Sequence, residues 1–103
     1  MNKRTDALKI SPKTKKIVSE RDSVEGHPCC IFCGSPYAKP EAHYIPRSQG
    51  GLGIPQNVGT VCRICHTDLD HTGKREKMLH LFKDYLKIHY PDWDEKNLIY
   101  KKW

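Results

Sequence analysis

The sequence predicts a small α+β domain whose core is too poor in apolar residues to be stable without added support. The chain has 103 residues, which corresponds to one domain. Only 37% of the residues are hydrophobic and 29% are charged, and a small domain of this composition usually needs disulfides or a metal ion. Two Cys-x-x-Cys pairs, Cys30 with Cys33 and Cys62 with Cys65, offer the ligands for such an ion.

The spacing of these four cysteines predicts a structural zinc site. A two-residue gap lets both sulfur atoms of a pair face one ion, and Gly34 permits a tight turn after the first pair. Four thiolates complete the tetrahedral shell of zinc, so this ion would stabilise the fold and not bind a substrate. Chance spacing and a redox-active pair are the alternatives. Cys29 is expected to be a small buried residue, with an exchange between Cys29 and Cys30 as ligand left open.

The charge of the chain favours a polyanionic partner. The formal net charge is +6, and the Lys and Arg residues gather in residues 3–16 and 74–102. Such a basic balance is typical of nucleic-acid binding, although a solvated surface explains the charge equally well. No apolar run resembles a signal peptide or a membrane span. We therefore expect a cytoplasmic protein, in which cysteine pairs bind metal more readily than they form disulfides.

Local signals predict one helix and two strands before the second cysteine pair. Residues 1–10 are polar and unpatterned, and are expected to form a flexible basic arm. Ser11 and Pro12 form a helix-start signal, because Ser caps the helix and Pro suits its first turn. The apolar and β-branched residues that follow indicate strands. The expected elements are a helix over 12–22, strands over 42–45 and 57–61, and a glycine-rich loop over 46–55.

Three helices are expected from the second cysteine pair onward. The first runs from about Arg63 to His71 and stops at Thr72-Gly73. The second covers residues 74–90, where apolar side chains recur at helical spacing and predict a buried face. Its expected core residues are Met78, Leu81, Phe82, Tyr85, Leu86 and His89. Asp92 would cap a short third helix to about residue 101. The zinc-containing core would thus span 28–72 and the C-terminal helices 74–103.

A second group of polar residues indicates a separate site. His66 and Asp70 are four residues apart on an expected helix, so their Cβ atoms lie about 5–6 Å apart and could share one divalent ion. His43 on the incoming strand could accept a proton from water near neutral pH. Taken singly, His43 could be a structural histidine, His66 and Asp70 a surface pair, and Asn57 a turn residue. Their joint order favours a site.

This joint order resembles the HNH endonuclease family, especially its small phage-encoded members. The matching segment runs from Cys30 to Asp70. It contains His43 with a proline three residues later, a polar-Gly-Gly loop, then Asn57, and Cys-x-x-Cys-His with an acid four residues on. The resemblance implies a ββα-metal, treble-clef-like finger flanked by N- and C-terminal helices. It also implies a catalytic divalent ion, Mg²⁺, Mn²⁺ or Ni²⁺, beside the structural Zn²⁺.

The resemblance assigns a role to each residue of the second site. His43 would be the general base, and Asn57 would hold the loop that orients His43. His66 and Asp70 would ligate the catalytic ion, and Arg47 would contact a phosphate of the DNA.

One position departs from the family pattern. The residue before the general base is often a metal ligand, and here it is Ala42. On a regular strand Glu41 points to the face opposite that of Ala42, so it could replace that ligand only if the strand is bulged or twisted at this point. His71 is a further possible ligand.

These features predict a metal-dependent DNA endonuclease that hydrolyses phosphodiester bonds. By resemblance it would be phage-encoded, present in the host cytoplasm and associated with terminase subunits of the packaging machinery. A single site favours a monomer that nicks one strand. The alternative is a non-catalytic zinc module that binds nucleic acid. A third hypothesis is a protein-interaction module with Trp93 and Trp103 as exposed anchors.

Overall fold

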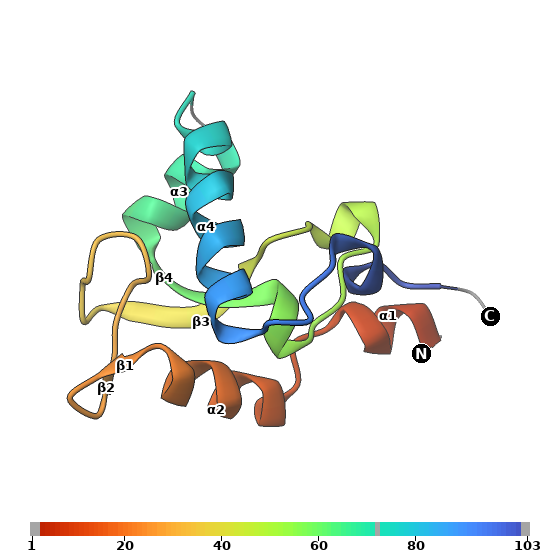
Figure 1. The fold of residues 1–103 in the computed structure, drawn as a ribbon, viewed down its shortest axis with the longest axis horizontal. Helices are drawn as coiled ribbons and strands as arrows, with labels where there is room; N and C mark the ends of the chain where they lie inside the picture. Colours follow the sequence, from red (N-terminus) through yellow and green to blue (C-terminus); the bar gives the residue numbers. More distant parts are fainter. Residues whose placement is uncertain (1–2, 72, 102–103) are drawn as a thin grey trace.

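A two-stranded antiparallel sheet lies at the centre of the protein (Figure 1). The computed structural model describes residues 3–71 and 73–101. Its helices are α1 (Lys3–Leu8), α2 (Pro12–Arg21), α3 (Arg63–His71) and α4 (Arg75–His89), with short 3₁₀ helices η1 (Arg47–Gln49), η2 (Pro55–Asn57) and η3 (Glu95–Leu98). Its strands are β1 (Ser23–Val24), β2 (His27–Pro28), β3 (Ala38–His43) and β4 (Val58–Cys62). The predicted α+β fold class is confirmed.

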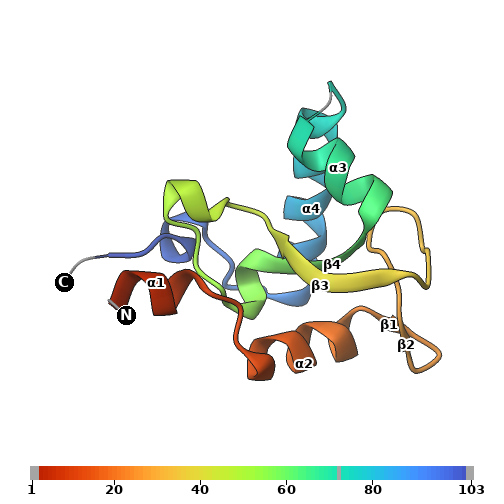
Figure 2. The ribbon, with the colours of Figure 1, turned by 180° about the vertical axis from the view of Figure 1, so that it is seen from behind.

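The central sheet lies between helices on its two sides. Helix α2 packs on β3 and β4 from one side, while α3 and α4 stand together on the other (Figures 1 and 2). The side chain of Phe82 on α4 is fully buried and makes edge-to-face contacts with Phe32 and Tyr44, at centroid distances of 5.8 and 5.6 Å. The hydrophobic core therefore connects the first cysteine pair, β3 and α4.

Helices α2, α3 and α4 begin and end close to the predicted residues. The Ser11 hydroxyl accepts a hydrogen bond from the Thr14 N–H, and Pro12 occupies the first turn of α2. Helix α3 has the predicted bounds. On α4 the buried face is narrower than expected, because Leu81 is 51% exposed and His89 is also exposed. No helix within the described ranges is long and apolar enough to cross a membrane.

Residues 3–8 form helix α1, so the prediction of a flexible arm over 1–10 is wrong there. The side chain of Leu8 is only 3% exposed. The Gly53 N–H donates to the Ala7 carbonyl at 3.0 Å. A single buried leucine and contacts with a loop more than forty residues away hold this helix in place, and neither produces a periodic signal in the sequence.

Strand β3 begins four residues earlier than predicted and contains a β-bulge. Ala42 pairs with Gly59 while Lys39 pairs with Val61, so one extra residue lies between them on β3. Pro40 stands within this irregular stretch, where its missing N–H breaks no ladder bond. The polar run Lys39-Pro40-Glu41 concealed the strand in the sequence.

The expected helix from Asp92 to about residue 101 is also corrected. The structure has only the 3₁₀ turn η3, and its cap is Asp94, which accepts from the Lys96 N–H at 2.9 Å. Trp93 is not an exposed anchor, because its Nε1–H donates to the Gln56 carbonyl at 2.8 Å and its ring packs against Tyr44. Trp103 lies outside the described residues.

A buried carboxylate joins α2 to the rest of the fold. The Asp22 side chain is fully buried beside the Arg21 guanidinium, at 2.7 and 3.0 Å. It also accepts hydrogen bonds from the Thr60 N–H of β4 and from the Tyr85 hydroxyl of α4. Arg21 in turn donates to the Pro55 and Val58 carbonyls. This network fixes three elements against one another.

We expect Asp22→Asn to lower the free energy of unfolding by about 3–5 kcal/mol, because it leaves Arg21 buried without its partner charge. Urea denaturation of the metal-loaded protein measures this change. Asp84→Asn, at an exposed position on α4, is the matched control and should change stability by less than about 0.5 kcal/mol. Equal stabilities of the two variants would contradict the role given to this network.

Candidate functional site

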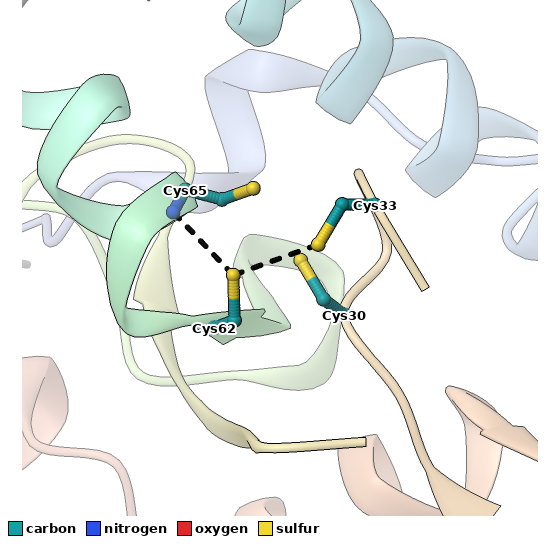
Figure 3. Close-up of side chains that lie close together, drawn as sticks. All are labelled: Cys30, Cys33, Cys62 and Cys65. Atoms are coloured by element: carbon teal, nitrogen blue, oxygen red, sulfur yellow. Dashed lines mark hydrogen bonds between the residues drawn. The ribbon is translucent and has the colours of Figure 1, made fainter. Parts of the chain in front are cut away.

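The four predicted zinc ligands converge in the structure. Cys30 and Cys33 come from the turn before β3, Cys62 ends β4, and Cys65 lies in the first turn of α3 (Figure 3). Their sulfur atoms all lie within 4.8 Å of one another, and Cys33 Sγ is 3.6 Å from Cys62 Sγ. Zinc–sulfur bonds of about 2.3 Å in a tetrahedron place sulfur atoms about 3.8 Å apart. The cluster is therefore arranged to hold a structural zinc ion.

The local backbone prepares these thiols for a metal. Gly34 adopts a φ of 79° and closes the turn through its N–H bond to the Cys30 carbonyl. Burial opposes ionisation of Cys30, but backbone hydrogen bonds, first of all at Cys62, lower its pKa to about 7. Burial and the neighbouring sulfur atoms raise the pKa of Cys65. Four adjacent thiols cannot all ionise alone, and a divalent cation would supply the positive charge that this site needs.

Cys29 lies apart from this cluster. Its thiol donates to the His27 carbonyl at 3.3 Å, and the residue is half-buried, not fully buried as expected. The alternative in which Cys29 replaces Cys30 as a ligand does not match this arrangement.

His43 is oriented by the carbonyl at the end of α1. Its Nε2 lies 3.0 Å from the Leu8 oxygen. A carbonyl only accepts hydrogen bonds, so Nε2 carries the hydrogen and Nδ1 is left as an acceptor. Burial lowers the pKa of His43; the Leu8 carbonyl opposes this, and the charges of Arg47 and His66 add to it. The ring is therefore held neutral with one basic nitrogen.

Asn57 holds the chain that follows His43. Its side chain is fully buried. The amide oxygen accepts from the Ile45 N–H at 2.8 Å, and the amide nitrogen donates to the Ile45 and Leu52 carbonyls at 3.1 and 2.8 Å. The amide of Asn57 thus ties Ile45, the residue before the glycine-rich loop, to Leu52 within the loop.

His66 and Asp70 project from one face of α3 into a shared pocket. His66 Nδ1 lies 3.3 Å from Asp70 Oδ2, and the two side chains are 42% and 44% exposed. Two ligands at right angles on an ion with bonds of about 2.1 Å lie about 3 Å apart. The pair therefore fits two adjacent positions on a divalent ion.

One open pocket of about 340 Å³ brings most of the second site together. It is lined by four residues that the sequence analysis assigned to the second site: His43, Arg47, His66 and Asp70. Asn57 is buried and is not one of the lining residues. Arg75 on α4 is a lining residue that the sequence analysis did not single out, and its guanidinium donates to the Leu69 carbonyl at 3.1 Å.

Glu41 also lines this pocket. Ala42 is fully buried in the core, while Glu41 and His43, on the other face of β3, both line the pocket. Its carboxylate is not yet in ligand position: among the residues that the structure describes, only the four cysteines bring three or more ligand atoms within 4.8 Å. The side chain of His71, the other possible ligand, lies outside the described residues.

Comparison with known proteins agrees with this geometry. A family model described as HNH endonuclease matches residues 30–82, from the first zinc ligand into α4. The chain belongs to the HNH endonuclease family. A relative named Anaredoxin, from Nostoc sp. strain PCC 7120, is 34% identical over 71 residues, which cover 68% of this chain and 87% of the relative. The matched segment contains both cysteine pairs and every residue that lines the pocket of His43, His66 and Asp70. The Leu8 carbonyl, which holds His43, comes from α1 outside that segment.

We expect the purified protein to contain about one zinc ion per chain, and Cys33→Ser to lose most of that zinc and to unfold at lower temperature. The reason is that structural zinc contributes about 10–16 kcal/mol of apparent binding energy in small domains. Metal analysis by mass spectrometry and thermal unfolding measure both effects. Cys29→Ser is the control, and a loss of zinc from it equal to that of Cys33→Ser would contradict the ligand set.

Proposed function

We propose that this protein is a metal-dependent DNA endonuclease that hydrolyses phosphodiester bonds. The observation that carries the proposal is the shared pocket, in which a neutral, oriented His43 faces the adjacent His66 and Asp70 side chains. Membership of the HNH endonuclease family supports a nuclease-type function.

The residues of the pocket have distinct tasks in this proposal. His66 and Asp70 bind a divalent ion, Mg²⁺, Mn²⁺ or Ni²⁺. Such an ion stabilises the negative charge of the phosphodiester and of the leaving oxygen. His43 Nδ1 accepts the proton of the attacking water, while the Leu8 carbonyl holds the opposite nitrogen. Arg47, exposed at the pocket wall, binds a phosphate oxygen.

Glu41 acts as the third protein ligand of this ion. His66 and Asp70 alone leave most of the coordination shell to water, and carboxylates suit Mg²⁺ and Mn²⁺. The strand is bulged at this point, as a role for Glu41 in place of Ala42 requires, and the exposed Glu41 side chain lines the same pocket as His66 and Asp70.

The partner in this proposal is DNA, held by the basic surface of a monomer in the cytoplasm. The net charge of +6 supports this partner. A phage origin and an association with terminase subunits are supported only by the resemblance of the motif to small phage-encoded HNH proteins.

The second candidate function is a zinc module that binds nucleic acid without cutting it. The observation that favours it is the distance of the Glu41 carboxylate from the other two ligands in the described structure. This function keeps the cysteine cluster and the basic surface, and it predicts salt-sensitive DNA binding with no hydrolysis.

We expect the zinc-loaded protein to nick supercoiled plasmid when Mg²⁺, Mn²⁺ or Ni²⁺ is added, and His43→Ala to reduce the rate at least about 100-fold because the base is lost. Gel electrophoresis of the plasmid measures the nicking. His80→Ala, an exposed histidine of α4, should cleave like the unmodified protein. Plasmid that stays supercoiled in every metal, while DNA binding persists, would favour the non-catalytic module.

We expect Glu41→Gln to weaken Mn²⁺ binding about tenfold or more, because it removes one of the charged ligands that set the affinity of the site. Electron paramagnetic resonance of free Mn²⁺, titrated with zinc-loaded protein, measures this affinity without any turnover. Glu76→Gln on the exposed side of α4 is the matched control. The assignment of Glu41 is wrong if both variants bind Mn²⁺ equally well.

A further inference from the structure

A second and larger cavity adjoins the pocket of the proposed nuclease site. It has a volume of about 630 Å³ and lies between β3 and the start of α3. Glu41 and His66 line both cavities. The two hollows therefore adjoin each other, with the proposed metal ligands Glu41 and His66 in the walls of both, and we call the two hollows together the groove.

Positively charged side chains line both parts of this groove. Lys39 and Arg63 line the larger cavity, and Arg47 and Arg75 line the smaller one. No ion pair among residues 3–71 and 73–101 involves any of these four side chains. Cations on either side of a metal-binding centre match successive phosphates of one nucleic-acid strand that passes through the groove.

The larger cavity also has features that suit a base. Pro36, Ala38 and Val61 give it apolar walls. Tyr37 stands at its edge with 87% of its surface exposed, and no aromatic contact within the described residues involves its ring. The Tyr37 N–H donates to the Ser35 hydroxyl at 3.1 Å, which holds the backbone of this turn. An exposed ring over apolar walls is a stacking platform for a nucleobase.

A base within an intact duplex cannot use this platform. Both of its faces are covered by neighbouring bases, and taking it out of the stack costs a few kcal/mol. An unpaired base meets no such cost. The apolar cavity with Tyr37 would therefore accept an unpaired base more readily than a paired one, whereas Lys39 and Arg63 would attract phosphates of either form.

We propose that this groove binds an unpaired nucleotide adjacent to the scissile phosphate, with its base stacked on Tyr37 and its phosphate held by Lys39 and Arg63. The position of the scissile phosphate rests on the function proposed above; the binding of an unpaired nucleotide does not. The protein thus prefers single strands, flaps or bubbles to intact duplex DNA.

Fluorescence anisotropy with labelled oligonucleotides tests the proposal without cleavage. Zinc-loaded protein carrying His43→Ala is titrated with a single strand, a duplex, and the same duplex with a central bubble. We expect Tyr37→Ala to weaken binding of the single strand and the bubble about 5- to 100-fold and to leave duplex binding nearly unchanged. Tyr37→Phe should restore the preference, because its ring stacks without the hydroxyl.

Matched variants separate stacking from a general loss of surface or charge. Ile88→Ala removes an apolar side chain that is 78% exposed on α4 and should not alter the preference. Lys39→Ala and Arg63→Ala should weaken binding to all three DNAs and each reduce the salt slope by about one. Lys77→Ala on α4 is their control.

The outcomes distinguish this inference from the nuclease proposal. If Tyr37→Ala keeps the single-strand affinity of its parent, or if Tyr37→Phe fails to restore it, the stacking inference is overturned even when plasmid nicking depends on His43. If nicking is absent but binding depends on Tyr37 as expected, the nuclease proposal fails and the groove remains a site for unpaired nucleotides.

Discussion

The convergence of four sulfur atoms is the constraint on which both sites depend. It joins two short turns that are separated by twenty-eight residues of sequence, and it fixes the point where α3 begins. His66 follows Cys65 directly, so the direction of the first turn of α3 sets the direction of His66 and, one turn later, of Asp70. A thiolate-bound zinc leaves no open position. The influence of the zinc site on the second site is therefore geometric: it places His66 and Asp70, the ligands that we propose for a divalent ion, in the wall of a separate pocket.

The orientation of His43 depends on contacts from both ends of the chain. The glycine-rich loop after His43 is hydrogen-bonded to α1, where the Gly53 N–H donates to the Ala7 carbonyl. It is also bonded to the C-terminal segment: the Leu52 N–H donates to the Leu98 carbonyl, and the Tyr100 N–H donates to the Gly50 carbonyl. A Cβ at Gly51 would lie 1.7 Å from the Ile45 carbonyl oxygen, and one at Gly53 would lie 2.2 Å from the Lys9 oxygen. Gly51 lets the loop fold back on Ile45, and Gly53 allows the close approach of Lys9, the residue after Leu8, whose carbonyl meets the ring of His43. Residues outside the matched segment 30–82 thus complete its site.

The sequence was most informative where a signal is local. The cysteine spacing predicted the metal cluster, Ser11-Pro12 predicted the start of α2, and the interval from His66 to Asp70 predicted their pairing. It failed where a long-range contact decides the structure. Helix α1 depends on its docking to the loop, and the true start of β3 depends on its pairing with β4. A bulge cannot be read from the run Lys39-Pro40-Glu41, because its polar composition and its proline both argue against a strand.

Alternation along β3 connects the two cavities. It places Ala42 on one face, where the structure buries it against the core, and Lys39, Glu41 and His43 on the other. Lys39 and Glu41 therefore line the larger cavity, and Glu41 and His43 line the smaller one. The extra residue between Lys39 and Ala42 changes the twist of the strand locally, and Glu41 still lines both cavities. Glu41 thereby stands where the cavity proposed for a nucleotide adjoins the pocket proposed for a divalent ion.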